Sequence, residues 1–143
     1  MIRIATMGIL LAAVALADDV DQRAKLTGSW QEASDAKEAW VLQPVPDGMH
    51  ITSSTAGKTV VEVDCKMAQE CDIKDSGHHA KVMMYFNGPK LVATETMGSR
   101  IVKRRFTVTG DGNTMELEVI PIEPDGKTET IVFKRVTTQT AKQ

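Results

Sequence analysis

The clearest pattern in the chain lies between residues 80 and 136, where apolar and polar side chains alternate with a period of two. Such alternation predicts β-strands that each bury one face. Short turn sequences rich in Gly, Pro, Asn and Asp separate the runs. Strands joined by links this short can only be antiparallel neighbours, because a parallel return needs a crossover of about a dozen residues. The predicted strands of this meander are 80–86, 90–97, 100–108, 114–122 and 127–136.

Shorter runs of the same kind precede the meander and predict strands at 26–31, 39–43, 49–54 and 58–66. Residues 67–79 break the alternation and predict an irregular loop, while 18–25 form a polar lead that is either flexible or one helical turn. The fold class is therefore all-β, an antiparallel up-and-down meander β-barrel of about 8–10 strands. A Greek-key sandwich would need long cross-connections, which the short turns do not offer.

Two charged residues fall on faces that are otherwise apolar. Glu95 shares its predicted face with Leu91 and Ala93, and Arg104 shares its face with Phe106. An unpaired buried charge is costly, so either these residues pair with each other or they hold the polar head of a ligand. The candidate ligand-binding residues are Arg104, Glu95, Met84, Phe106 and Met115. Methionines would make a cavity lining adaptable; the alternative is that they simply fill the core.

The first residues match a secretory signal peptide. Arg3 supplies the positive charge, residues 7–16 form the apolar segment, and the small residues Ala15 and Ala17 suit signal peptidase. We expect cleavage after Ala17 and a secreted or periplasmic protein; the alternative is a buried N-terminal helix. The expected organisation is a signal peptide at 1–17, a polar lead at 18–25, a barrel domain at 26–137 and a flexible tail at 138–143. No second apolar run approaches the ~20 residues of a membrane-spanning helix.

Cys65 and Cys71 are the only cysteines. In an exported chain this pair predicts a disulfide that closes a short loop. The alternative is a metal site that adds His78 and His79. The spacing does not match the usual zinc patterns, and adjacent histidines on an extended segment point to opposite sides. We therefore expect no metal and no cofactor.

Charge and motifs argue against two other classes of protein. A formal charge of −2 and a pI near 5.9 give no general attraction to nucleic acid. The chain lacks the G-x-S-x-G, H-E-x-x-H and glycine-rich phosphate-loop motifs, so we expect no enzyme. His50 is expected to point outward from its strand. The basic triplet 103–105 should alternate between the two faces of its strand, leaving only Arg104 inside.

The segment Leu26-Thr27-Gly28-Ser29-Trp30 resembles the Gly-x-Trp start of the lipocalins and fatty-acid-binding proteins. Arg135 lies near the end of the last strand, where this group often has an Arg over the Trp. The resemblance implies an antiparallel barrel holding a small apolar ligand, with Trp30 plugging one end. A guanidinium stacked on the indole contributes ~0.5–2 kcal/mol. Alternatively, Trp30 is an ordinary core residue and Arg135 a surface one.

These observations favour an exported, non-enzymatic, lipocalin-like β-barrel that binds a small apolar or amphipathic ligand. The alternative is an envelope structural or protein-interaction module with a filled core and no ligand; an inhibitor acting through its loops is a third hypothesis. The interior distinguishes the first two, because a ligand site needs a continuous cavity of about 300 Å³ or more.

Overall fold

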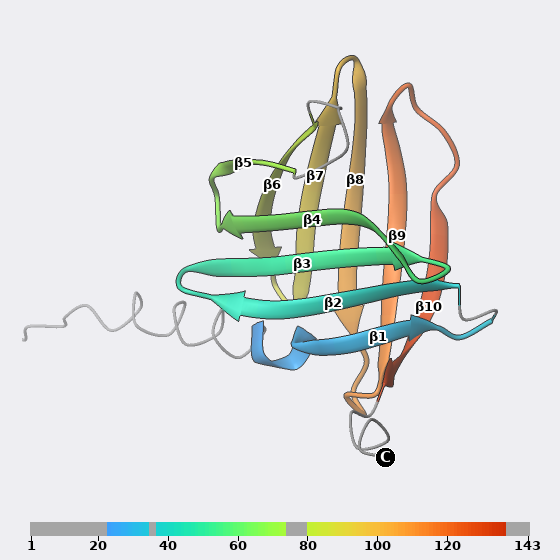
Figure 1. Cartoon of the computed structure of the whole chain (residues 1–143). Helices are drawn as coiled ribbons and strands as arrows, with labels where there is room; N and C mark the ends of the chain where they lie inside the picture. The colour runs from blue at the N-terminus through green and yellow to red at the C-terminus, as the bar shows by residue number, and fades with distance from the viewer. Residues whose placement is uncertain (1–22, 35–36, 74–79, 137–143) are drawn as a thin grey trace, which may run out of the picture.

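The computed structural model describes residues 23–34, 37–73 and 80–136. They form a sheet of 10 strands that curls into a nearly closed barrel (Figure 1). The strands are β1 (Gly28–Glu32), β2 (Glu38–Val45), β3 (Gly48–Thr55), β4 (Lys58–Lys66), β5 (Glu70–Asp72), β6 (Ala80–Asn87), β7 (Lys90–Met97), β8 (Arg100–Val108), β9 (Thr114–Glu123) and β10 (Glu129–Val136).

The sheet is an antiparallel meander in the order β4-β3-β2-β1-β10-β9-β8-β7-β6-β5. Each strand pairs with its neighbour in sequence except at one place, because β4 and β5 share no ladder. The first strand pairs instead with the last, with Trp30 opposite Arg135. The predicted fold class is confirmed, and the one interruption is a seam between β4 and β5.

The barrel is flattened into two layers that cross steeply, with the core between them. In Figure 1, β1–β4 run across the front and β6–β10 run behind them. Alternate residues of β9 and β10 face the core, since Met115, Leu117 and Phe133 are each 0% exposed. The other fully enclosed large side chains include Trp30, Leu42, Met49, Met84, Leu91 and Phe106.

Two local predictions are wrong. The loop expected at 67–79 contains the short strand β5, which pairs with β6 through Cys71 and Val82. Three residues are too few for a period of two to be recognised. The first strand begins at Gly28 and not at Leu26, because residues 23–26 form a helical turn that the Thr27 hydroxyl caps by donating to Arg23 O at 2.8 Å.

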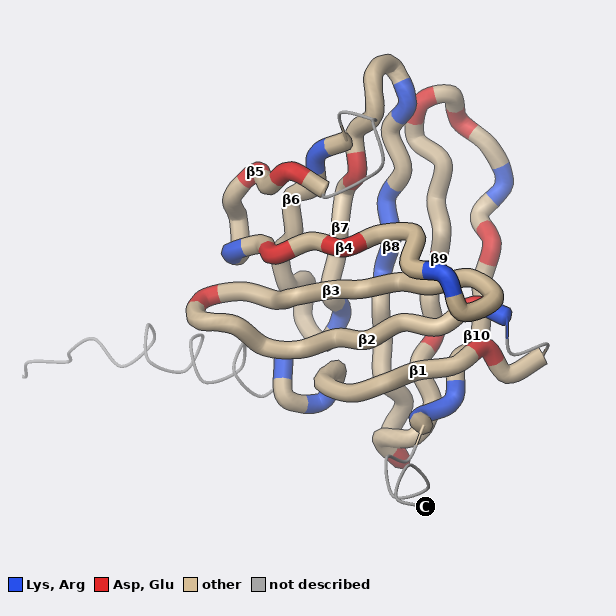
Figure 2. Tube along the Cα trace, viewed as in Figure 1, with Lys and Arg blue, Asp and Glu red and all other residues tan. Residues whose placement is uncertain are grey.

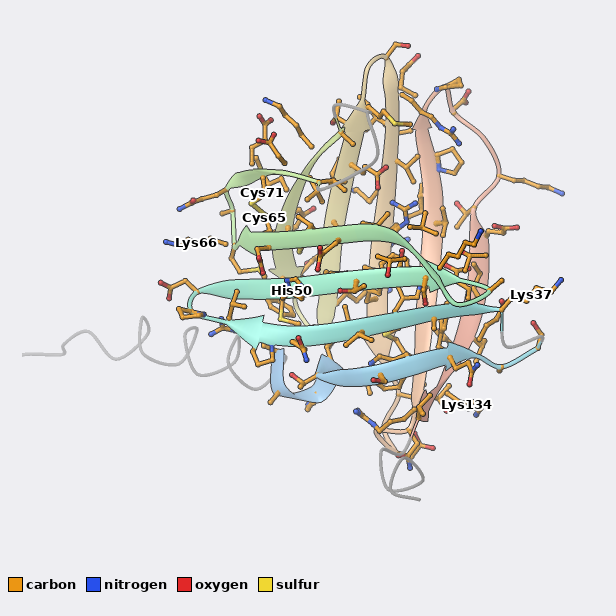
Figure 3. The ribbon with its side chains drawn as sticks, viewed as in Figure 1. Lys37, His50, Cys65, Lys66, Cys71 and Lys134 are labelled. Atoms are coloured by element: carbon orange, nitrogen blue, oxygen red, sulfur yellow. A yellow bond between two sulfur atoms is a disulfide. The ribbon has the colours of Figure 1, made fainter. Side chains whose placement is uncertain are left out.

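The predicted disulfide between Cys65 and Cys71 is confirmed, and it spans the seam. Cys65 lies on β4 and Cys71 on β5, the two ends of the sheet (Figure 3). A backbone hydrogen bond from Ala68 N to Met84 O, at 2.7 Å, anchors the intervening turn to β6. The bond therefore joins covalently the two edges that the ladder leaves open.

The predicted signal peptide, the tail at 138–143, and both His78 and His79 lie outside the described residues. Within the described part of the chain, no helix has the length and apolar character needed to cross a bilayer.

Replacing both cysteines by serine, Cys65→Ser with Cys71→Ser, should lower the free energy of unfolding by about 2 kcal/mol, because the bond closes only a short loop in the unfolded chain. Urea denaturation followed by tryptophan fluorescence measures this loss. Dithiothreitol should destabilise the parent protein by the same amount and leave the double variant unchanged. A double variant that fails to fold would show that the disulfide supports the whole barrel and not only its seam.

Candidate functional site

One end of the barrel is closed by a cation–π stack that Arg135 makes on Trp30. The guanidinium carbon lies 4.2 Å from the centroid of the indole ring. The same group donates from Nε to Gly112 O at 2.9 Å, and from its two terminal nitrogens to Thr27 O at 2.7 Å and Lys25 O at 3.0 Å. One side chain thus ties the N-terminal turn, β10 and the turn between β8 and β9 together.

Gly28 is required at this end by space and by conformation. Its φ is +137°, and a Cβ there would lie 2.5 Å from a terminal nitrogen of Arg135. Trp30 is 0% exposed, and its indole N–H donates to Leu26 O at 2.9 Å. The structure therefore brings together the three residues that the resemblance singled out.

The turn that supplies Gly112 O is itself held by Asp111. Its carboxylate accepts from Asn113 N at 2.9 Å and from the Thr109 hydroxyl at 2.8 Å. The hydrogen bond from the Asn113 backbone, followed by that from Thr109, lowers the pKa of Asp111 below its ordinary value. This keeps the carboxylate ionised as the acceptor of the turn.

The interior contains a small cavity of about 30 Å³, room for about two water molecules. Across it, the rings of Trp40 and Phe106 meet edge to face with centroids 5.2 Å apart. The lining residues are Trp40, Ile51, Val61, Val63, Ile73, Val82, Met84, Ala93, Glu95, Arg104 and Phe106.

Glu95 and Arg104 form an ion pair at the edge of this cavity. An Arg104 terminal nitrogen donates to Glu95 Oε2 at 2.7 Å, and the side chains are 26% and 20% exposed for Arg104 and Glu95 respectively. Both residues also line a second, outward hollow of about 140 Å³. The pair thus lies where the inner cavity and the outer hollow meet.

We call this open end of the barrel the mouth. It is lined by Glu95, Met97, Arg100, Val102 and Arg104. The inward side chains of β7 and β8 are only half-buried at the mouth, whereas those nearer the other end of these strands are buried. The strands of the back layer extend beyond the front layer at the mouth (Figure 1). Two guanidinium groups against one carboxylate suit the mouth to an anionic group, which arginine binds through charge-assisted hydrogen bonds.

Four of the five candidate ligand-binding residues line the cavity: Glu95, Arg104, Met84 and Phe106. Met115 does not line it, since it is buried in the core on β9. Trp40 was not singled out from the sequence, although it spans the interior opposite Phe106. Its position at the centre of the short apolar run 39–43 was the available signal.

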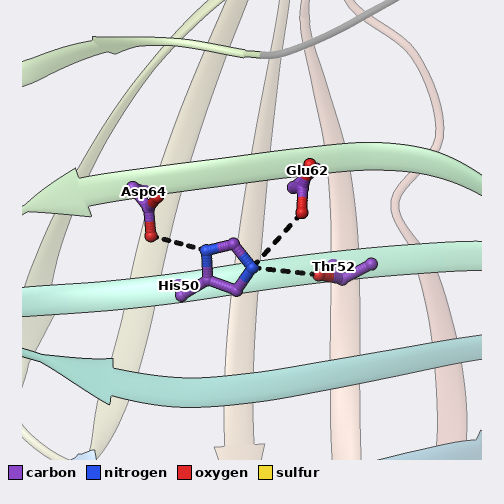
Figure 4. A network of polar contacts seen from close by, with 4 residues as sticks. All are labelled: His50, Thr52, Glu62 and Asp64. Carbon is purple, nitrogen blue, oxygen red and sulfur yellow. Dashed lines mark hydrogen bonds and ion pairs between the residues drawn. The ribbon is translucent and has the colours of Figure 1, made fainter.

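The outer surface carries two polar clusters. On β3 and β4, the ring of His50 lies between Asp64 and Glu62, with Nδ1 at 2.5 Å from Asp64 Oδ1 and Nε2 at 3.6 Å from Glu62 Oε2 (Figure 4). His50 therefore points outward as predicted. Within residues 23–34, 37–73 and 80–136, no group of His, Cys, Asp or Glu is arranged to hold a metal ion.

The second cluster surrounds Glu118 on β9. Lys90 Nζ lies 3.3 Å from one carboxylate oxygen and an Arg105 terminal nitrogen lies 2.8 Å from the other. Partial burial raises the pKa of Glu118, but the hydrogen bond from Lys90 and the nearby positive charges outweigh it, so the pKa lies below its ordinary value. Arg105 faces outward and Arg104 inward, so the predicted alternation of the basic triplet is correct; Figure 2 shows these basic residues along β8.

No protein-family model and no curated protein sequence matches the chain. Two solved structures from Ramazzottius varieornatus share its fold. A secretory abundant heat soluble (SAHS) protein matches with a TM-score of 0.67 and 13% identity, over 78% of this chain and 96% of that one. Secretory abundant heat soluble protein 4 matches with a TM-score of 0.64 and 15% identity, over 79% and 96%. At such identities the likeness concerns the fold alone.

Replacing Arg135 by methionine should lower the free energy of unfolding by about 3 kcal/mol, because it removes three hydrogen bonds to carbonyl groups and the cation–π contact. The free energy of unfolding of Arg135→Lys should lie between those of the parent and Arg135→Met, since an ammonium keeps the charge but cannot reach all three carbonyl acceptors. Lys134→Met, one residue earlier with its exposed ammonium on Thr114, is the matched control. Equal urea midpoints for Arg135→Met and Lys134→Met would contradict the role of Arg135 in closing this end of the barrel.

The Glu118 cluster predicts a stability change on the acid side. Because the folded-state pKa is lowered, the stabilisation is complete above the unfolded value of about 4.5 and is lost as the pH falls through the folded-state pKa. Glu118→Gln should therefore lower the free energy of unfolding at pH 7 and have a smaller effect at pH 3. Urea titrations at both pH values measure this, with Glu116→Gln on the same strand as the control. An equal loss at both pH values would refute it.

Proposed function

We propose that this protein is an exported, non-enzymatic barrel that binds a small amphipathic anion at its mouth. The head group lies against Arg104 and Arg100, and the apolar part follows Met97 and Val102 towards the interior. The ion pair between Arg104 and Glu95, placed where the outer hollow meets the inner cavity, is the observation that carries this proposal.

The guanidinium of Arg104 has hydrogen-bonding capacity to spare. An arginine side chain offers five N–H donors in a rigid fork. Within the described ranges, Glu95 is its one recorded side-chain partner, through a single terminal nitrogen. A carboxylate or sulfate head could bind the remaining donors without displacing Glu95, which keeps the buried charge neutralised while the site is empty.

The size of the ligand follows from the two volumes. The mouth, at about 140 Å³, accommodates a head group and the first carbons of a chain. The inner cavity, at about 30 Å³, accepts a tail only if interior side chains move. Met84 is suited to that movement because its unbranched thioether adopts several rotamers at small cost.

Export is supported by three observations. The N-terminal segment has the order of a signal peptide, the structure contains a disulfide, and the two structural neighbours are named as secretory proteins. A non-enzymatic role is supported by the mouth itself. Its lining contains no serine, cysteine or histidine, and its one carboxylate is held by Arg104.

The proposal is tested by titrating the protein with dodecanoate by calorimetry, with tryptophan emission as a second signal. The parent should bind, and Arg104→Met should bind about 10- to 100-fold more weakly, which corresponds to losing a charge-assisted hydrogen bond. The double variant that combines Glu95→Gln with Arg104→Met leaves no unpaired carboxylate, and it should bind dodecanoate as weakly as Arg104→Met alone. Lys103→Met, the outward neighbour, should bind like the parent.

Dodecanol, which has the same chain without the charge, should bind more weakly than dodecanoate to the parent, and this difference should shrink for the Arg104 variant, which keeps only Arg100. Absence of dodecanoate binding to the parent, or an Arg104→Met affinity equal to that of Lys103→Met, would refute the proposal.

A second candidate function is a protein-interaction module. The nearly filled interior favours it, as does a groove of about 270 Å³ on the outer face of β5–β7. Met83 and Tyr85 line this groove and are 42% and 41% exposed. Large apolar side chains gathered on a surface are typical of contact sites.

A further inference from the structure

The seam is the weakest part of the barrel wall. Between β4 and β5 no ladder of backbone hydrogen bonds continues the sheet, whereas all other neighbouring strands are paired. The wall there is closed by side chains, by the hydrogen bond from Ala68 N to Met84 O, and by one covalent bond, between Cys65 and Cys71. A wall held by side-chain packing yields more easily than one held by a ladder.

The inner cavity lies directly behind this seam. Val61 and Val63 of β4, and Ile73 immediately after β5, line it from the two sides of the interruption. Val63 is 3% exposed and Ile73 7% exposed, so these two side chains are packed into the core beside the seam. Separating β4 from β5 would therefore enlarge the cavity, which is the change that the tail of a ligand needs.

The cysteines are placed so that the bond can be broken without leaving buried polar groups unpaired. Around Cys65 Sγ, Gln69 O lies at 3.3 Å and Val82 O at 3.8 Å, while Gln69 O lies 3.5 Å from Cys71 Sγ. Each thiol formed by reduction would have a carbonyl acceptor in reach. Cys65 is 1% exposed and Cys71 only partly buried, so an external thiolate reaches Cys71 first.

We propose that the disulfide is a redox-controlled strap: it holds the seam shut, and its reduction lets β4 and β5 part and admits the ligand to the inner cavity. The thiolate of a small dithiol attacks Cys71 Sγ, and the electron pair of the S–S bond leaves on Cys65 Sγ, which takes a proton. The second thiol of the reductant then displaces Cys71. The bond gains two electrons and two protons, and the dithiol is oxidised to a disulfide.

The opening of the seam is tested without any ligand by amide hydrogen exchange on the oxidised and the dithiothreitol-reduced protein. Reduction should speed exchange about 10-fold or more in 67–73 and 81–84, which flank the seam, and leave 28–32 and 129–136 at the closed end unchanged. The double variant Cys65→Ser with Cys71→Ser should match the reduced protein, and dithiothreitol should not change it. Equal exchange in both redox forms, or faster exchange throughout the barrel, overturns the proposal.

The consequence for the site rests on the proposed function and is tested by stopped-flow association of dodecanoate. The reduced protein and the serine variant should associate about 10-fold faster than the oxidised protein. Equal rates in the two redox forms would overturn the strap as a gate and leave the proposed function intact. Faster exchange at the seam without dodecanoate binding to either form would overturn both the gate and the proposed function.

Discussion

The contact between Arg135 and Trp30 is the constraint on which the rest of the barrel depends. It joins the first strand to the last, and the same guanidinium binds the carbonyl groups of the N-terminal turn and of a distant turn. Gly28 is the residue that lets the backbone approach so closely. None of these three residues lines the inner cavity or the mouth, so the closed end and the candidate site are separate parts of the barrel.

The same two-residue alternation that builds the wall also places charges inside it. Glu95 and Arg104 occupy inward positions on paired strands, so each neutralises the other where the inner cavity meets the outer hollow. An ion pair placed in this way leaves neither charge alone. Arg104 also lines the outer hollow of about 140 Å³, where we propose that the head group of the ligand binds.

Much of the fold could be predicted from the sequence because inward and outward positions alternate over long runs, as along β7, β8 and β9. The inward placement of Glu95 and Arg104 followed from that pattern alone. Strand β5 could not be recognised because three residues show no period, and Leu26 belongs to a turn whose cap depends on Thr27. The volume of the cavity depends on how Trp40 and Phe106 meet across the layers, which is a tertiary contact that no local pattern contains.

Native mass spectrometry of the protein purified from its own host tests most directly whether the barrel carries an amphipathic anion. The account predicts the mass of the chain, two hydrogens lighter for the disulfide, together with a bound anionic amphiphile that gentle activation releases. The same preparation of the variant that combines Glu95→Gln with Arg104→Met should lack the bound molecule. A bare protein mass from the parent, under conditions that preserve non-covalent complexes, would contradict ligand carriage and leave the protein-interaction function.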